Sequence, residues 1–86
     1  MIQDVKAPIT AYLAYEHRTN RVFPFLLKWD GRNYKVQSLD FHYTYKNGAV
    51  LYHVFSVSTE TLSFKLVLNT ENLFWTVEQI TDGLPE

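Results

Sequence analysis

The chain has 86 residues, with eight basic and nine acidic side chains, a formal net charge of -1 and no cysteine. This length predicts one small domain over residues 1–86, and the lack of cysteine excludes disulfide bonds, thiolate metal sites and cysteine nucleophiles. Hydrophobic residues make up 47% of the chain, which excludes a disordered protein, and no segment is long and apolar enough for a membrane span or a signal peptide. We therefore expect a compact cytoplasmic protein that does not enter a membrane.

The first third of the chain carries weak strand patterns. Residues 9–16 alternate between apolar and polar side chains, and residues 17–20 form a polar loop. Pro24 has no amide proton to donate to a sheet, so it belongs at the start of a strand or on an edge. Residues 1–7 and 81–86 are expected to fray, and no helical periodicity is long enough to predict a helix.

Asp30-Gly31 is one of two strong hairpin signals, because both residues tolerate the positive φ of a type I′ turn. A two-residue loop at this point pairs Trp29 with Arg32 and Leu27 with Tyr34. These residues form an apolar face, and the opposite face is mostly polar, as expected for a sheet over a core.

Asn47-Gly48 is the second hairpin signal. Taking these two residues as the loop places Tyr43 opposite Tyr52 and His42 opposite His53. The odd-numbered residues from Leu39 to Tyr45 then form the apolar, inward face. The inward positions of residues 33–46 change from even to odd, and we expect a β-bulge near Gln37-Ser38 to reconcile them.

The last part of the chain predicts two further strands. Residues 62–68 alternate strictly, with Leu62, Phe64, Leu66 and Leu68 inward. Residues 73–80 follow after a turn as a strand with Trp75 and Val77 inward. The predicted fold is all-β, a five- or six-stranded antiparallel meander curled into a small open barrel of SH3-like size.

The run from Pro24 to Val36 resembles a family of small uncharacterised bacterial β domains. The resemblance extends more loosely through residues 52–57, 64–68 and 75–80. Members of that family occur as free-standing short proteins or at the C-terminal end of proteins resembling translesion DNA polymerases. The resemblance implies an accessory or interaction role and brings no catalytic residues. Residues 40–45 are more aromatic here than in the family. The matched positions are Pro24, Leu27, Lys28, Trp29, Gly31, Arg32, Tyr34, Lys35 and Val36.

The hairpin around Asp30-Gly31 carries the first candidate binding site, Lys28, Trp29, Arg32 and Lys35. Basic side chains beside an indole are typical of surfaces that contact single-stranded nucleic acid. The alternative is a solvated hairpin face in which Trp29 and Arg32 form a cation–π pair that supports only the fold. Because the net charge is -1, any contact with nucleic acid is expected to be weak.

Asp40, His42 and His53 form the second candidate site, for a metal ion. The predicted register brings the two imidazoles together, with the carboxylate on the same face, and this ligand set suits zinc or iron. The alternative is that both histidines are half-exposed strand residues without a ligand.

Fourteen aromatic residues are more than a core of this size needs. Tyr12, Phe55 and Phe74 fall opposite the predicted inward face, so we expect surface aromatics that bind a protein partner or a second copy. The alternative is a curled sheet with both faces covered. No nucleophile elbow or phosphate-binding glycine loop occurs. The sequence therefore predicts a non-enzymatic binding or interaction module with no cofactor, or alternatively a domain that binds a metal or small ligand.

Overall fold

The structure is a computed structural model that describes residues 2–82, and its regular elements over that range are all strands. They confirm the all-β class and the expectation of no helix. No helix in the described part of the chain could therefore cross a membrane. The strands are β1 (Ile2–Pro8), β2 (Thr10–Glu16), β3 (Arg21–Trp29), β4 (Arg32–Lys35), β5 (Ser38–Asn47), β6 (Val50–Ser58), β7 (Leu62–Asn69) and β8 (Phe74–Asp82).

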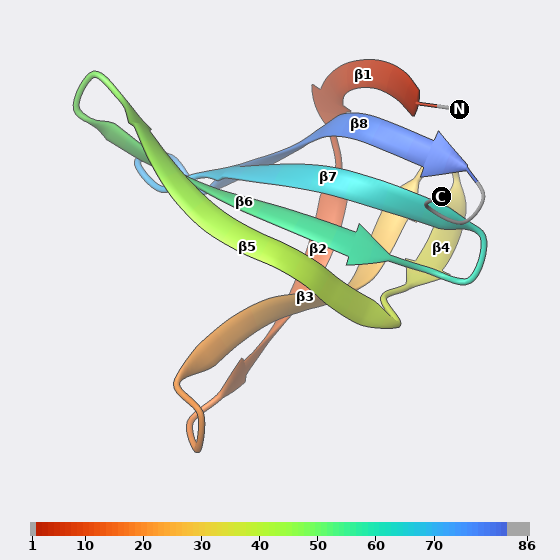
Figure 1. Cartoon of the computed structure of the whole chain (residues 1–86), viewed down its shortest axis with the longest axis horizontal. Coiled ribbons are helices and arrows are strands. Elements are labelled where there is room, and N and C mark those ends of the chain that lie inside the picture. The colour runs from red at the N-terminus through yellow and green to blue at the C-terminus, as the bar shows by residue number, and fades with distance from the viewer. Residues whose placement is uncertain (1, 83–86) are drawn as a thin grey trace.

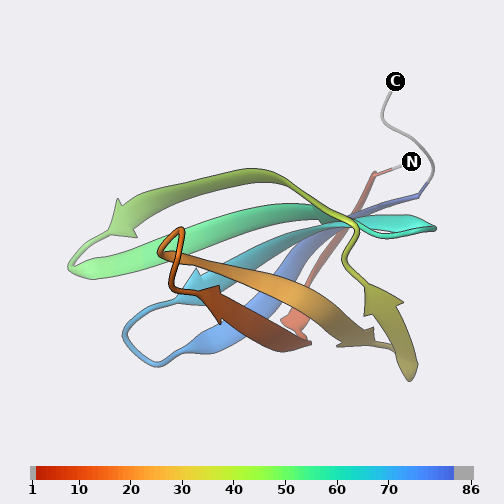
Figure 2. The same ribbon diagram turned by 90° about the horizontal axis from the view of Figure 1, so that it is seen from below.

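Two antiparallel sheets make up the fold. The large sheet has the order β1-β8-β7-β6-β5, and the small sheet has the order β2-β3-β4. The strands of the small sheet cross those of the large sheet and cover one of its faces (Figures 1 and 2). We call the covered face of the large sheet its inner face and the opposite one its outer face.

The predicted five- or six-stranded open barrel is wrong in its strand count and in its single sheet, because the described residues form eight strands in two antiparallel sheets. The chain bends from one sheet to the other at Ile9 and again at Val36-Gln37. At the second bend the Val36 amide still donates to the Phe25 carbonyl in the small sheet (3.0 Å), whereas the Gln37 amide donates to Ser58 in the large sheet (2.8 Å). The predicted long strand over residues 33–46 is therefore divided into β4 and β5.

The two hairpin predictions differ in outcome. Asp30 and Gly31 both have positive φ, 52° and 74°, and the pairs Trp29–Arg32 and Leu27–Tyr34 are confirmed. In the second hairpin Gly48 has φ 63° but Asn47 is still part of the strand, so the loop is Gly48-Ala49. A glycine at the first loop position is typical of a type II′ turn. The predicted pairing of β5 is consequently displaced by two residues.

The bulge in β5 lies at Asp40 rather than near Gln37-Ser38. The Ser38 hydroxyl donates to one carboxylate oxygen of Asp40 and the Ser58 hydroxyl to the other. These bonds hold the extra residue against the outer face. The inserted residue also reverses the alternation of side chains along β5.

The core lies between the two sheets. Its fully or nearly buried side chains come mainly from β6, β7 and β8, and the small sheet contributes Leu27. The inward prediction for Phe64 and Leu66 is confirmed, and so is that for Val77. The same prediction for the aromatics of β5 is wrong, because Phe41, Tyr43 and Tyr45 lie on the outer face and are 69%, 48% and 42% exposed. The core members are Leu27, Phe55, Val57, Phe64, Leu66, Val77 and Ile80.

The expectation of frayed ends stays a prediction, although the described residues at the two ends lie in paired strands. Strand β1 pairs with β8 from Ile2 opposite Thr81 to Pro8 opposite Thr76, with a register shift between Asp4 and Ala7. Position 1 and positions 83–86 lie outside the described residues.

Candidate functional site

The most developed candidate site is a cavity of about 390 Å³ between the two sheets, which we call the histidine cavity. Alternation along β5 and β6 places His42 and His53 on the inner face beside Phe55. The tip of the β2–β3 hairpin, including Arg21, reaches over this face from the small sheet. The cavity is lined by Asn20, Arg21, Val22, Leu39, His42, His53, Phe55, Leu68 and Thr70.

The two histidines are in direct contact, although their pairing differs from the prediction. His42 lies opposite Phe55, and His53 lies opposite Thr44, so the imidazoles meet on a diagonal. His42 Nε2 and His53 Nδ1 are 2.8 Å apart, and the His42 ring stacks on Phe55 with a centroid distance of 4.3 Å. One of these two ring nitrogens must carry a hydrogen and donate it, and the other must accept it.

Electrostatics disfavour a positive charge on His42. Burial lowers the pKa of His42, and the nearby His53 and Arg21 lower it further. A low-dielectric environment and neighbouring positive charges both disfavour the imidazolium form. His42 therefore enters the neutral state at a lower pH than a free histidine does.

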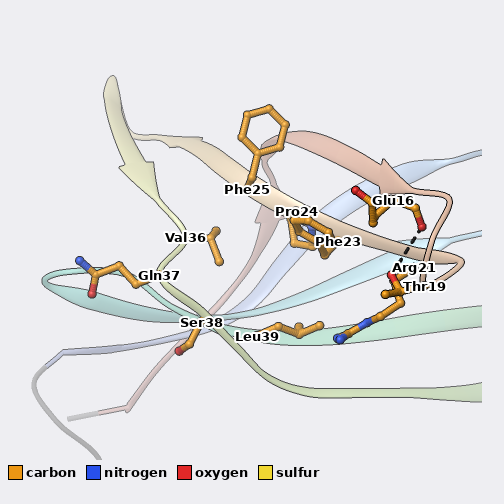
Figure 3. A pocket seen from close by; sticks show the side chains of 10 residues that line it. All are labelled: Glu16, Thr19, Arg21, Phe23, Pro24, Phe25, Val36, Gln37, Ser38 and Leu39. Carbon is orange, nitrogen blue, oxygen red and sulfur yellow. Dashed lines mark hydrogen bonds between the residues drawn. The ribbon is translucent and has the colours of Figure 1, made fainter.

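Arg21 also lines a second cavity, of about 450 Å³, in the split between β3 and β5 (Figure 3). Its side chain extends from β3 toward Leu39 on β5, whereas Phe25 points away from the split. Arg21 and Leu39 line both cavities and so form the wall between them. The second cavity contains a carboxylate, Glu16, and the histidine cavity does not.

The structure separates the predicted metal ligands. Asp40 lies on the outer face with the serines that hold it, whereas His42 and His53 are on the inner face. The bulge at Asp40 is the physical reason, because it moves this side chain to the opposite face from the one that simple alternation predicts. Within residues 2–82 no three His, Asp or Glu side chains are grouped to hold a metal ion.

The basic hairpin is also divided between two faces. Lys28 and Lys35 are exposed on the side of the small sheet that faces away from the core. Trp29 packs against the core cluster on the other side. Arg32 is exposed opposite Trp29. The indole therefore supports the fold, and this geometry does not display it beside the two lysines for stacking on a base.

The exposed aromatics form a second surface, on the outer face along β5. This aromatic edge consists of Phe41, Tyr43 and Tyr45, and Tyr45 stacks on Tyr52 with a centroid distance of 5.0 Å. Burial among these rings raises the pKa of Tyr45. Val54 is completely buried although it faces away from the core, because it lies opposite Tyr43.

Among the aromatics predicted for the surface, Tyr12 and Phe74 are exposed, at 40% and 68%. Phe55 is in the core at 3%, so that prediction is wrong. Sequence reasoning missed Arg21 as a site residue. The available signal was its place directly after the polar loop 17–20 at a hairpin tip, but no pattern in the sequence shows that this tip lies over His42.

Comparison with protein-family models, with curated proteins and with solved structures finds no match for this chain. The resemblance to small bacterial β domains therefore stays a prediction.

Proposed function

We propose that this protein is a non-enzymatic interaction module that pairs with a second copy of itself through β5. The observation that carries the proposal is the free edge of this ten-residue strand, which no other strand pairs with among residues 2–82, next to the exposed row Phe41, Tyr43 and Tyr45. Alternate residues of an edge strand leave their amide and carbonyl groups without a sheet partner. Natural edges are normally protected by proline or several charges, and the stretch 41–47 has a single lysine.

The sequence of β5 is suited to pairing with itself. In an antiparallel arrangement centred on Tyr43, Phe41 of each copy lies opposite Tyr45 of the other. Cross-strand aromatic pairs contribute about 0.2–1 kcal/mol each beyond alanine pairs. These three aromatic pairs and a short backbone ladder support a weak dimer, with a dissociation constant of about 10–1,000 μM.

Sedimentation velocity over a range of protein concentrations tests the proposal. Phe41→Lys removes two of the aromatic pairs, so we expect it to weaken the dimer by about 2–30-fold. Phe74→Lys is the matched control, because Phe74 is as exposed as Phe41 (68% against 69%) but lies on β8, away from the edge. A protein that stays monomeric at 1 mM, or a dimer that both variants weaken equally, contradicts pairing through β5.

Contact with nucleic acid is less well supported than self-pairing. Trp29 packs against the core instead of lying beside the basic side chains Lys28, Arg32 and Lys35. An oligonucleotide titration at low salt is the direct comparison. Amide shifts near residues 28–35, with none along β5, would favour the nucleic-acid function over self-pairing.

A further inference from the structure

The histidine cavity has the size and position of a small-molecule site. Its volume of about 390 Å³ falls in the range of ligand pockets, and it lies between two sheets, where their inner faces supply a rigid wall. Phe55 forms part of this wall and is itself 3% exposed. The cavity belongs to the inner face, so an inference about it does not depend on the proposed pairing through β5.

The lining has one apolar part and one basic part. Val22, Leu39, Phe55 and Leu68 provide the apolar surface. Arg21, His42 and His53 are its only residues with basic side chains, and none of the residues that line it is acidic. A ligand that matches this lining has an apolar body and an anionic head group.

Arg21 is the group best able to hold the head group. Its guanidinium makes no hydrogen bond or ion pair within the described part of the chain, so its N–H groups can be donated to a ligand. A guanidinium binds a carboxylate through two parallel hydrogen bonds. The imidazole pair lies near Arg21, as the effect of Arg21 on the pKa of His42 indicates.

We propose that the histidine cavity binds a small apolar carboxylate. Arg21 and the His42–His53 pair hold the carboxylate, and the apolar body packs on Phe55 and Leu68. In its neutral form the pair can donate one N–H to the ligand besides the hydrogen bond between the two rings, and it donates more strongly once it takes up a proton.

The proposal includes a pH dependence with a defined sign. Arg21 on β3 and His53 on β6 are the charged or titratable groups that face His42, and Leu68 and Thr70 of β7 bring no charge. A bound carboxylate favours protonation of the imidazole pair, so binding is coupled to proton uptake. Affinity therefore rises as the pH falls from 7.5 to 5.5, a range in which the ligand stays ionised.

A titration followed by NMR tests the site, with 2-naphthoate as the probe and 2-naphthamide as its uncharged match. We expect 2-naphthoate to shift the amides of residues 20–22, 42, 53 and 68, with a dissociation constant of about 0.1–1 mM for a ligand of this size. We expect 2-naphthamide to bind at least fivefold more weakly.

Two arginine variants identify the group that holds the carboxylate. Arg21→Gln should weaken 2-naphthoate at least tenfold and leave 2-naphthamide unchanged. Arg18→Gln is the control, because Arg18 lies in the loop directly before Arg21 but does not line the cavity. The proposal is overturned if 2-naphthoate shifts no cavity amide, if both probes bind equally, or if the two variants behave alike. A monomeric protein that still binds 2-naphthoate in this way contradicts the proposed self-pairing alone.

Discussion

Leu27 connects the two sheets, and replacing it with alanine tests whether they fold as one unit. Its side chain is completely buried, and it is the residue of the small sheet that belongs to the core cluster among residues 2–82. Leucine to alanine changes at such sites cost about 2–5 kcal/mol, because the transfer energy is lost and a cavity remains. Strands pack on this side chain from a second sheet and cannot easily collapse, so we expect about 3–4 kcal/mol.

This loss is large compared with the stability expected for 86 residues, about 4–13 kcal/mol. The melting temperature should fall by about 12–30 °C, from about 4–8 °C for each kcal/mol in a domain of this size. Leu13→Ala is the matched control, because Leu13 lies on the neighbouring strand β2 but is 42% exposed. We expect it to cost less than about 1 kcal/mol.

Urea unfolding followed by tryptophan fluorescence measures both the magnitude and the coupling. Trp29 reports on the small sheet and Trp75 on the large sheet, so Trp29→Phe and Trp75→Phe leave one reporter each. Coincident transitions in the two backgrounds, both shifted by Leu27→Ala, are expected for one cooperative unit. A decrease in the free energy of unfolding below 1 kcal/mol, or a decrease detected by Trp29 but not by Trp75, would refute the conclusion that Leu27 packs in one core shared by both sheets.

Three other perturbations follow from local geometry. Gly48→Val should destabilise the protein by about 1–2 kcal/mol, because the positive φ of Gly48 is strained for a β-branched residue. Steric overlap is not the cause, since nothing lies within 4 Å of an added Cβ. Ala49→Val is the control and should have little effect in the same denaturation assay. Folding lowers the pKa of His42, so below pH 6.5 the unfolded state binds more protons than the folded state. The free energy of unfolding therefore falls as the pH is lowered from 6.5 to the folded pKa of His42. In His42→Gln the difference between the melting temperatures at pH 7.5 and 5.5 should be smaller than in the unchanged protein. Treatment with EDTA should leave the melting temperature unchanged, because Asp40 lies on the opposite face from His42 and His53, and a drop of several degrees would argue for a bound metal.

Local chemistry in the sequence was sufficient for the first hairpin and insufficient for the second. Asp30 and Gly31 can both adopt positive φ, so a single two-residue loop fits them and the register follows. Asn47-Gly48 allows two loops, one with glycine second and one with glycine first. The choice depends on pairing along the whole of β5, which local propensity does not determine.

The composition of the candidate site could not be predicted from the sequence, because it depends on a contact between residues that are far apart along the chain. The position of the bulge is set by the bond between Asp40 and Ser58, 18 residues away, and that bulge decides which side chains share a face with His42. Alternation shows that Phe41, Tyr43 and Tyr45 lie on one face but not which face is covered. The contact of the histidine rings was predictable because a displacement of two residues preserves the face of each strand.

The pairing of β1 with β8 has a consequence for how the protein is synthesised. The strand that leaves the ribosome first among those described hydrogen-bonds to the one that leaves last, and the interval from Pro8 to Asp82 takes roughly 4–15 s at about 5–20 residues per second. Until then β1 and β7 both lack the neighbour that lies between them in the finished sheet. A chain truncated after Asn69 therefore presents two additional unpaired edges among its described strands, and we expect chaperones to bind it more than the full chain.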